Sequence, residues 1–333
     1  MLIKRQLLLV VGASIVILGL SLVLHAKRVA MERSVAERGE PLRFEQPSPT
    51  PIPAPECATI LFGGDMMFDR HIRQKAQAVG NYDFIFRDLE PLLKSADLVV
   101  ANLEGPVTDF PSRSVGSEVG STDNYFFTFE PKAILDSLSR WPFVVNLGNN
   151  HISNFGAEGL LQTKSYLLKA KLGFFGYTVP GQQEETTWQT SVNGLRIAFV
   201  NYNQFVVGGL EQSLLDIAES RTSADVVVVY THWGNEYVPE NDVQRNLAHQ
   251  FVDAGADLVI GSHPHVVQSM EDYAGKRIYY SLGNFVFDQY FEEAVQNGLL
   301  VESTVCRSPE TQLLEWNFME YPIQLNLDGS TTL

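Results

Sequence analysis

Short apolar runs alternate with longer amphipathic stretches from Cys57 to the end of the chain. The short runs are rich in β-branched residues, which is typical of strands, whereas the longer stretches carry apolar positions at helical spacing. Strands that alternate with helices predict a layered α/β fold. We predict strands at 59–63, 98–101, 143–147, 196–201, 226–230, 258–260 and 277–281, with an additional strand at 124–130, a mobile loop at 112–122, and helices at 84–94, 132–139, 157–171 and 243–253.

The N-terminal segment carries an uncharged apolar run at 7–24, preceded by Lys4 and Arg5. A run of this length predicts a helix that spans the hydrocarbon core of a membrane. A cleaved signal peptide is the alternative, but its apolar region is usually shorter and ends in an A-x-A-like site, whereas basic residues follow here at 27–28. We therefore predict an uncleaved signal anchor at 1–28. Basic residues lie on both sides of it, so charge alone does not give its orientation.

Residues 29–56 are expected to be a linker. The part from 38 to 56, RGEPLRFEQPSPTPIPAPE, is rich in proline, which favours an extended and semi-rigid spacer. Such a spacer would hold one globular domain, at 57–333, away from the membrane.

Composition limits the functions that this domain can have. The chain has 333 residues, 45% of them hydrophobic, which is enough to bury a sizeable core. Its formal net charge is -15, and it has no basic stripe, which argues against nucleic-acid binding. The two cysteines, Cys57 and Cys306, would be able to pair in an outward-facing compartment, or they are two unrelated free thiols; spacing alone does not decide between these alternatives.

Polar side chains of the types that bind metals follow several predicted strands. In open α/β sheets, ligands bind at the edge formed by the carboxyl ends of the strands, so these residues are expected to gather there. Glycines beside them allow close approach and sharp turns of the backbone. In chain order, the residues are Asp65, Asn102, Glu104, Asn149, Asn150, His151, His232, His263, His265 and Asn284.

Each of these residues alone has an ordinary interpretation, such as a turn aspartate, a solvated acid, a helix cap or a buried histidine. Their joint placement after separate strands favours a shared site. In the segment His263-Pro264-His265, the proline favours an extended backbone at the residue before it, so that both imidazoles point to one side. His71 and His249 are not assigned to the site.

A mixed set of carboxylate, amide and imidazole ligands suits zinc, manganese or iron better than calcium, which prefers oxygen ligands only. The expected cofactor is therefore one or two divalent metal ions of this kind. Such ions would activate a water and hold the oxygens of an ester during hydrolysis. His151 is then expected to be a catalytic proton donor or to stabilise the transition state, rather than to be a ligand.

At these residues the chain resembles the CapA-type family of capsule and poly-gamma-glutamate synthesis, which is related to the calcineurin-like metallophosphoesterases. Together, the matching segments span nearly all of the chain after the linker, and it is the joint match that is specific. The segments are GGDMMFDR at 63–70, ANLEGPVTD at 101–109, NLGNNHISNFGAEGL at 146–160, THWGNEY at 231–237, GADLVIGSHPHVVQ at 255–268 and YSLGNFVFD at 280–288.

The resemblance implies a four-layer α/β metallophosphoesterase-like fold, with two packed central sheets flanked by helices. It also implies roles for individual residues. Asp65 and His265 match ligands of a first metal, Glu104 the bridging carboxylate, Asn150, His232 and His263 ligands of a second metal, and His151 the catalytic histidine.

Two positions depart from the superfamily pattern. The histidine that the pattern places two residues after the first aspartate is Met67 here, and the bridging aspartate is Glu104. The centre therefore holds one metal tightly, holds a second one loosely, or recruits another side chain such as Asn102. Arg70 and Asn284 are expected to contact substrate, since arginine matches carboxylate or phosphate bidentately.

The predicted anchor and linker indicate a single-pass protein of the cell membrane with an extracytoplasmic domain. The resemblance implies that it acts on an anionic polymer such as poly-gamma-glutamate or capsule material, together with other membrane-bound synthesis subunits. We predict a metallohydrolase-like domain that cleaves, transfers or exports this polymer. The alternatives are a non-catalytic polymer-binding or scaffold subunit with a vestigial metal site, and a phosphatase that faces the cytosol.

Overall fold

The computed structural model describes residues 21–34, 56–176 and 186–333. Residues 21–34 are helical, and the residues from 56 onward belong to a separate compact unit, Pro53–Leu333. Within the described residues, no helix is both long enough and apolar enough to cross a membrane. Most of the apolar run predicted to be a membrane anchor, at 7–24, lies outside the described residues, as does most of the predicted linker.

The first sheet of the compact unit is mixed. Its strands β1 to β4 are parallel, whereas β12, β13 and β14 add antiparallel strands beyond β1, and β11 pairs with the end of β1. The order is β14 (Thr331–Thr332), β13 (Leu314–Leu325), β12 (Asn297–Arg307), β1 (Glu56–Met66), β2 (Leu98–Leu103), β3 (Phe143–Asn146) and β4 (Gly173–Phe175), with β11 (Asn284–Val286) off this path.

The second sheet has a parallel centre and antiparallel edges. Its order is β5 (Thr187–Val192), β6 (Leu195–Asn203), β7 (Val226–His232), β8 (Leu258–Ser262), β10 (Lys276–Tyr279) and β9 (Met270–Tyr273).

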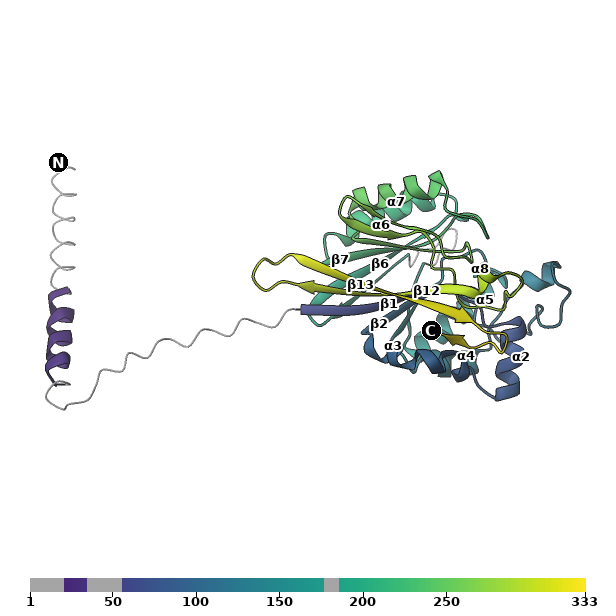
Figure 1. The fold of residues 1–333 in the computed structure, drawn as a ribbon, viewed down its shortest axis with the longest axis horizontal. Helices are drawn as coiled ribbons and strands as arrows, with labels where there is room; N and C mark the ends of the chain where they lie inside the picture. The colour runs from purple at the N-terminus through teal and green to yellow at the C-terminus, as the bar shows by residue number, and fades with distance from the viewer. Residues whose placement is uncertain (1–20, 35–55, 177–185) are drawn as a thin grey trace. The chain divides into compact units, whose positions relative to one another are not determined.

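Helices cover the outer face of each sheet (Figure 1). The second sheet is covered by α6 (Gly209–Ser220) and α7 (Asp242–Ala254). A capping box between Asn241 and Gln244 starts α7, because the two side chains satisfy backbone N–H groups reciprocally. The helices beside the first sheet are α2 (Arg70–Val79), η1 (Asp83–Leu89), α3 (Glu90–Ser95), α4 (Pro131–Leu138) and α5 (Gly156–Ala170); η2 (Thr122–Tyr125) and α8 (Glu293–Gln296) are short turns.

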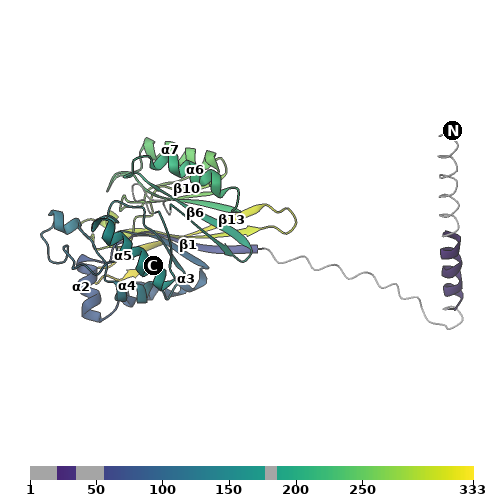
Figure 2. The same cartoon turned by 180° about the vertical axis from the view of Figure 1, so that it is seen from behind.

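The two sheets pack against each other through a core of apolar side chains. Successive residues of a strand point to opposite faces, so Ile60 and Phe62 of β1 meet Phe199 and Val228 of the second sheet, whereas Leu61 faces the helices. The result is a four-layer helix–sheet–sheet–helix arrangement, which is also visible from behind (Figure 2). The predicted four-layer α/β arrangement is thereby confirmed for the described residues.

The seven main strands that the apolar pattern predicted are all present, and the helices at 132–139, 157–171 and 243–253 are confirmed to within a residue or two. The predicted helix at 84–94 is divided into η1 and α3. The additional strand at 124–130 is wrong: η2 lies there, and only an isolated bridge joins Val107 to Phe129. Its aromatic residues Phe127 and Phe129 are buried in the helix-side core, which explains the strand-like composition. The segment 112–122 is irregular, as expected.

Cys57 and Cys306 form a disulfide across β1 and β12. They are direct partners in the antiparallel register, with their Cα atoms 4.1 Å apart. The bond joins parts of the chain that are 249 residues apart in sequence, so it cross-links the first strand of the domain to its C-terminal antiparallel strands.

Candidate metal centre

A break in the pairing of β1 places Asp65 at the centre of the site. Up to Phe62, β1 pairs with β12, and from Asp65 it pairs with β11. The crossing requires glycine, because a Cβ atom on Gly64 would lie 1.8 Å from the carbonyl oxygen of Gly283. A hydrogen bond from the Asp65 N–H to that same carbonyl oxygen, at 3.0 Å, stabilises the close approach of the two backbone segments. The sequence motif at 63–65 therefore encodes the position of the carboxylate.

Glu104, His232 and His263 bring potential ligand atoms within 4.8 Å of one another. They come from the ends of three strands: Glu104 follows β2, His232 ends β7, and His263 follows β8. The His232 Nε2 atom lies 3.5 Å from Glu104 Oε1 and 2.9 Å from Asn150 Oδ1. Asn150 thus adds an amide oxygen to the same group.

The centre has the donor set that a divalent metal requires. Glu104 Oε1 and His263 Nδ1 are buried, and neither atom meets a hydrogen-bond partner among the described residues. A buried polar atom without a partner carries a desolvation cost that a bound cation would relieve. Carboxylate, amide and imidazole donors suit zinc, manganese or iron. The described residues therefore fit the predicted metal at Glu104, Asn150, His232 and His263.

The backbone of the His263-Pro264-His265 segment differs from the prediction. His263 and His265 have φ angles of 98° and 59°, so neither is extended. Non-glycine residues with such angles are uncommon and concentrate at functional sites. Both histidines still reach Asp65, because the backbone N–H of His263 and the His265 Nδ1 atom lie 3.0 Å and 3.3 Å from its Oδ2 atom.

Ser262 orients the imidazole of His232. Its hydroxyl donates to the Thr231 carbonyl at 2.8 Å, so the oxygen is free to accept from His232 Nδ1 at 3.1 Å. This arrangement favours the proton of His232 on Nδ1, so Nε2 is the atom that would bind a cation shared with Glu104 and Asn150. Metal-binding histidines are commonly fixed in this way by a partner of the second ring nitrogen.

Two buried carboxylates dominate the electrostatics of the centre. Burial and the neighbouring charge of Asp65 hold the pKa of Glu104 well above its ordinary value. Burial also acts to raise the pKa of Asp65, but the hydrogen bond with His265 and the charges of His265 and His232 outweigh it, and the pKa is lowered. Burial, reinforced by the charge of His263, lowers the pKa of His232 well below its ordinary value. A bound cation would offset the negative charge that Glu104 bears when ionised.

His151 lies at the edge of the centre. Its Nδ1 atom is 3.1 Å from the Tyr125 carbonyl oxygen, so Nδ1 carries the proton, and its Nε2 atom is 3.9 Å from Glu104 Oε1. Burial, together with the charge of His265, lowers its pKa to about 3. The ring is therefore neutral at physiological pH, with Nε2 unprotonated and directed to the carboxylate.

The two predicted substrate contacts lie in different surroundings. Arg70 pairs with Asp288 and lies over the rings of Phe127 and Phe287, at 5.2 Å and 5.4 Å from their centroids. It also lines a cavity of about 360 Å³, together with Asn124, Tyr125, Tyr237 and Gln289. Because the Tyr125 carbonyl holds His151, this cavity adjoins the centre.

Asn284 is fully buried. Its amide donates to Gln289 Oε1 at 3.1 Å and to the Val295 carbonyl at 2.9 Å, and its oxygen lies 2.9 Å from His265 Nδ1. Asn284 thus orients His265. Substrate contact by Arg70 or Asn284 stays a prediction.

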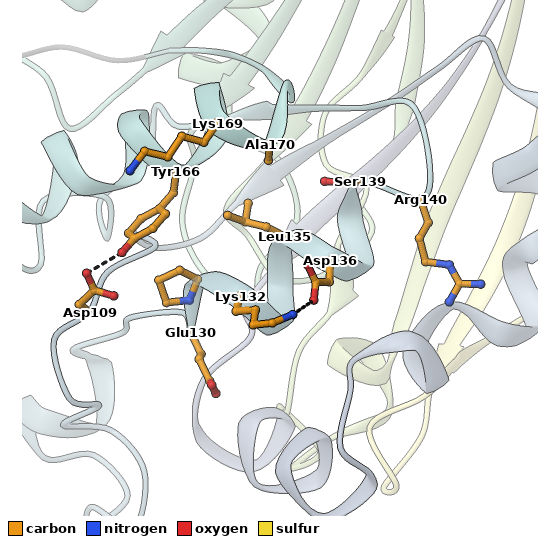
Figure 3. A pocket seen from close by; sticks show the side chains of 11 residues that line it. Asp109, Glu130, Lys132, Leu135, Asp136, Ser139, Arg140, Tyr166, Lys169 and Ala170 are labelled. Carbon is orange, nitrogen blue, oxygen red and sulfur yellow. Dashed lines mark hydrogen bonds and ion pairs between the residues drawn. The ribbon is translucent and has the colours of Figure 1, made fainter.

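The other histidines within the compact unit lie elsewhere. His71 contacts the Leu327 carbonyl at 3.0 Å. His249 lies on α7 and pairs with Glu271 of β9 at 3.0 Å. A larger cavity, of about 740 Å³, lies between α4 and α5 and contains none of the proposed ligands. In it, Lys132 pairs with Asp136, and Tyr166 donates a hydrogen bond to Asp109, so these polar groups already have partners within the domain (Figure 3).

The sequence interpretation missed two groups that hold the centre in place, the hydroxyl of Ser262 and the carbonyl of Tyr125. Asn149 was among the residues expected at the strand ends, and its amide donates to Asn102 Oδ1 and to the Leu103 carbonyl. A backbone carbonyl leaves no signal in a sequence.

The fold and the site together define a four-layer α/β protein with a candidate metal centre at the carboxyl ends of its parallel strands. A family model described as "Bacterial capsule synthesis protein PGA_cap" matches residues 59–289, which is more than half of the chain. The chain therefore belongs to this family of CapA-like proteins of capsule and poly-gamma-glutamate biosynthesis, and the resemblance drawn from its motifs is confirmed.

Two curated relatives illustrate the membership. The chain is 34% identical over 246 residues to the "PGA biosynthesis protein CapA" of Bacillus subtilis (strain 168), covering 68% of this chain and 63% of the relative. It is 32% identical over 277 residues to the "Capsule biosynthesis protein CapA" of Bacillus anthracis, covering 78% of this chain and 66% of the relative. The chain thus matches somewhat less than two thirds of the length of each relative.

The similarity to solved structures is more distant. A phosphatase from Mycoplasma pneumoniae superposes with a TM-score of 0.48 at 13% identity, covering 81% of this chain and 95% of the phosphatase. A hypothetical protein from Thermus thermophilus superposes with a TM-score of 0.47 at 18% identity, covering 79% of this chain and 100% of that protein.

Proposed function

We propose that this protein is a membrane-anchored, metal-dependent hydrolase or transferase that acts on an ester or amide bond of an anionic polymer during capsule or poly-gamma-glutamate synthesis. One observation carries the proposal. Glu104 and His263 each have a buried donor atom without a partner among the described residues, and with His232 they place ligand atoms within 4.8 Å of one another, beside His151.

The residues of the centre suggest a division of labour. A divalent ion at Glu104, Asn150, His232 and His263 would supply Lewis acidity and favour ionisation of water. The neutral His151 ring presents an unprotonated Nε2 atom, so it accepts a proton from the attacking water and returns it to the leaving group. The Tyr125 carbonyl stabilises the protonated ring in between, because it holds Nδ1–H throughout.

Arg70 suits recognition of the polymer. It is directed to the cavity that adjoins His151, and its guanidinium matches carboxylate or phosphate geometry. The net charge of -15 disfavours a general attraction for anionic polymers, so a local group must bind them. Arg70 and the metal centre are the groups that would serve.

The proposed location rests on sequence and on the disulfide. The uncharged run at 7–24 favours a single membrane anchor at 1–28, with a proline-rich spacer at 29–56 and the domain at 57–333. The Cys57–Cys306 disulfide suits an oxidising compartment, which supports the proposal that the domain faces away from the cytosol. A periplasmic or extracellular reporter fused after Leu333 should be active, whereas activity of a cytosolic reporter would contradict this orientation.

The function is tested with the full-length protein in detergent. After metal loading, it should hydrolyse a phosphodiester or a gamma-glutamyl polymer in a broad substrate screen. The His151→Ala variant should retain metal and lose turnover by roughly 100-fold or more, as expected for a general acid–base residue. The matched control is His249→Ala, which removes a surface histidine of α7 and should leave turnover unchanged.

A non-catalytic, polymer-binding subunit is the second candidate, and the replacement of a superfamily histidine by Met67 favours it. Met67 is fully buried in the helix-side core, where its sulfur accepts the Asp69 N–H at 3.0 Å, so it adds nothing to the centre. Full metal content without turnover of any substrate, combined with retention of poly-gamma-glutamate in a pull-down, would support this candidate over the hydrolase.

A further inference from the structure

Asn102 lies in the middle of the centre. Asp65, Asn102 and Asn146 are direct register partners on three neighbouring parallel strands, β1, β2 and β3. All three side chains are fully buried. The amide of Asn102 therefore lies between Asp65 on one side and Asn146 on the other.

The backbone determines which end of the Asn102 amide faces the carboxylates. Asn149 accepts from the N–H groups of His151 and Ile152 with its oxygen and donates to the Leu103 carbonyl with its nitrogen, so its orientation is unambiguous. The same Asn149 nitrogen lies 3.0 Å from the outer atom of Asn102, which must then be the oxygen. Asn146 donates to that oxygen too, at 3.0 Å. The NH₂ group of Asn102 consequently points at Asp65 and Glu104.

This NH₂ group donates a hydrogen bond to one oxygen of each carboxylate. It donates to Asp65 Oδ1 at 2.8 Å and to Glu104 Oε2. The other oxygen of Asp65 already interacts with the His263 N–H and with His265 Nδ1. Among the four carboxylate oxygens, only Glu104 Oε1 lacks a hydrogen-bond partner in the part of the chain that the structure describes, and it faces His232.

His265 and Met67 leave the Asp65 side without further inward ligands among the residues described. The Nδ1 atom of His265 faces two acceptors, Asn284 Oδ1 and Asp65 Oδ2, and the NH₂ group of Asn284 is held by the Val295 carbonyl. The inward nitrogen of His265 therefore acts as a hydrogen-bond donor in this arrangement, and it keeps that role beside Asp65 in the inference below. Met67 lies in the apolar core on the helix side.

We propose that the carboxamide of Asn102 takes the place of a second cation, so that the centre holds one divalent ion, at Glu104, His232 and His263. Asn102 and Asp65 are positioning residues in this arrangement: the amide holds the two carboxylates together, and Asp65 holds the two histidines of the 263–265 segment. Asn102 does not serve as an oxygen ligand, because its oxygen points away from the centre. This inference rests on the metal centre of the proposed function.

The number of metal ions is the direct test. Full-length protein in detergent is stripped of metal, dialysed against Mn²⁺, and analysed for metal content and by electron paramagnetic resonance. One tightly bound Mn²⁺ per chain, with the spectrum of an isolated ion, is the expected result. Two ions with a spin-coupled spectrum would overturn the inference and leave the proposed function intact. No bound ion would overturn the metal centre itself and this inference with it.

A substitution at Asn102 tests the role of the amide. Asn102→Asp replaces the NH₂ group by an oxygen without changing the size of the side chain, and the bound Mn²⁺ should rise from one to two per chain. Asn317→Asp is the matched control on the exposed face of β13, and it should keep one. If Asn102→Asp folds and still binds one ion, the amide does not set the number. The wild-type stoichiometry and spectrum decide the question even if the variant does not fold.

Discussion

Glu104 and His263 place ligand atoms within 4.8 Å of each other, and each has one buried polar atom that meets no hydrogen-bond partner within the described residues. The two residues are far apart in sequence, and they come from different sheets, since Glu104 follows β2 and His263 follows β8. A fold that buries two ligand atoms without hydrogen-bond partners, and binds no cation there, would bear the full desolvation cost of both atoms. This relationship is the basis of the first two predictions.

Removal of two histidine ligands should abolish metal binding. In the double variant His232→Ala/His263→Ala, the affinity for Zn²⁺ or Mn²⁺ should fall by more than roughly 100-fold, because even the loss of a residue that merely orients a ligand costs about 10–100-fold. Elemental analysis after dialysis measures the effect. The control is His71→Ala, whose ring contacts Leu327 outside the centre, and it should keep the full metal content. Full metal retention in the double variant would contradict the proposed centre.

Chelation should destabilise the folded domain. A ligand at about 100 times its dissociation constant stabilises the native state by about 2.7 kcal/mol. In a domain of this size, each kcal/mol corresponds to roughly 2–4 °C in Tm. EDTA should therefore lower Tm by about 5–10 °C, and added Zn²⁺ or Mn²⁺ should restore it. An unchanged Tm in differential scanning calorimetry would mean that the centre does not bind metal in the folded protein.

Asp225 joins the two sheets at a position outside the metal centre. It accepts from Arg196 at the start of β6, with an Nη2–Oδ1 distance of 2.8 Å, and pairs with Arg307 of β12 at 2.7 Å. The hydrogen bonds from Arg196 are the main reason that the pKa of Asp225 lies below its ordinary value. Asp225→Asn should cost about 1–2 kcal/mol in the free energy of unfolding at pH 7, a range reduced for solvent screening of the exposed Arg196.

The pH dependence of this contribution has a definite sign. The pKa of Asp225 is lower in the folded than in the unfolded protein, so its contribution is present above the unfolded value of about 4 and is lost as pH falls below it. Urea titrations at pH 7 and pH 3 should show the difference between wild type and variant shrinking at the lower pH. Asp272→Asn removes the more exposed pair with Arg277 and should have a smaller effect. A difference independent of pH would contradict the ion-pair explanation.

The disulfide should contribute to stability through the unfolded chain. Cross-linking Cys57 to Cys306 restricts a loop that includes nearly the whole domain, and such bonds typically contribute about 2–4 kcal/mol. Reduction, or the double variant Cys57→Ser/Cys306→Ser, should lower the free energy of unfolding by this amount in denaturant titrations. The reductant should have no effect on the double variant, which serves as the control.

Much of the architecture was predictable, because a buried strand is visible in the sequence as a run of apolar residues. The central strands are continuous apolar runs, because residues such as Val228 and Ile260 lie between packed layers. Their alternation with helices predicted a layered α/β fold, whereas the four-layer order was implied by the family resemblance. The C-terminal strands β12 and β13 were missed. Buried residues of β12 are interrupted by half-exposed ones, and most residues of β13 are half-exposed or exposed, so neither strand carries a continuous apolar run. Pairing of the cysteines depended on the register of β1 with β12, which spacing does not reveal.

The sequence by itself determined which residues gather at the centre, because polar side chains at the carboxyl ends of parallel strands meet at one edge of a sheet. It did not determine what each atom does there. The positive φ angle of His263, the inward NH₂ group of Asn102 and the unpartnered Glu104 oxygen arise only when strands from both sheets meet. The orientation of an amide depends on donors and acceptors that belong to other strands, and those are brought together by the tertiary structure alone.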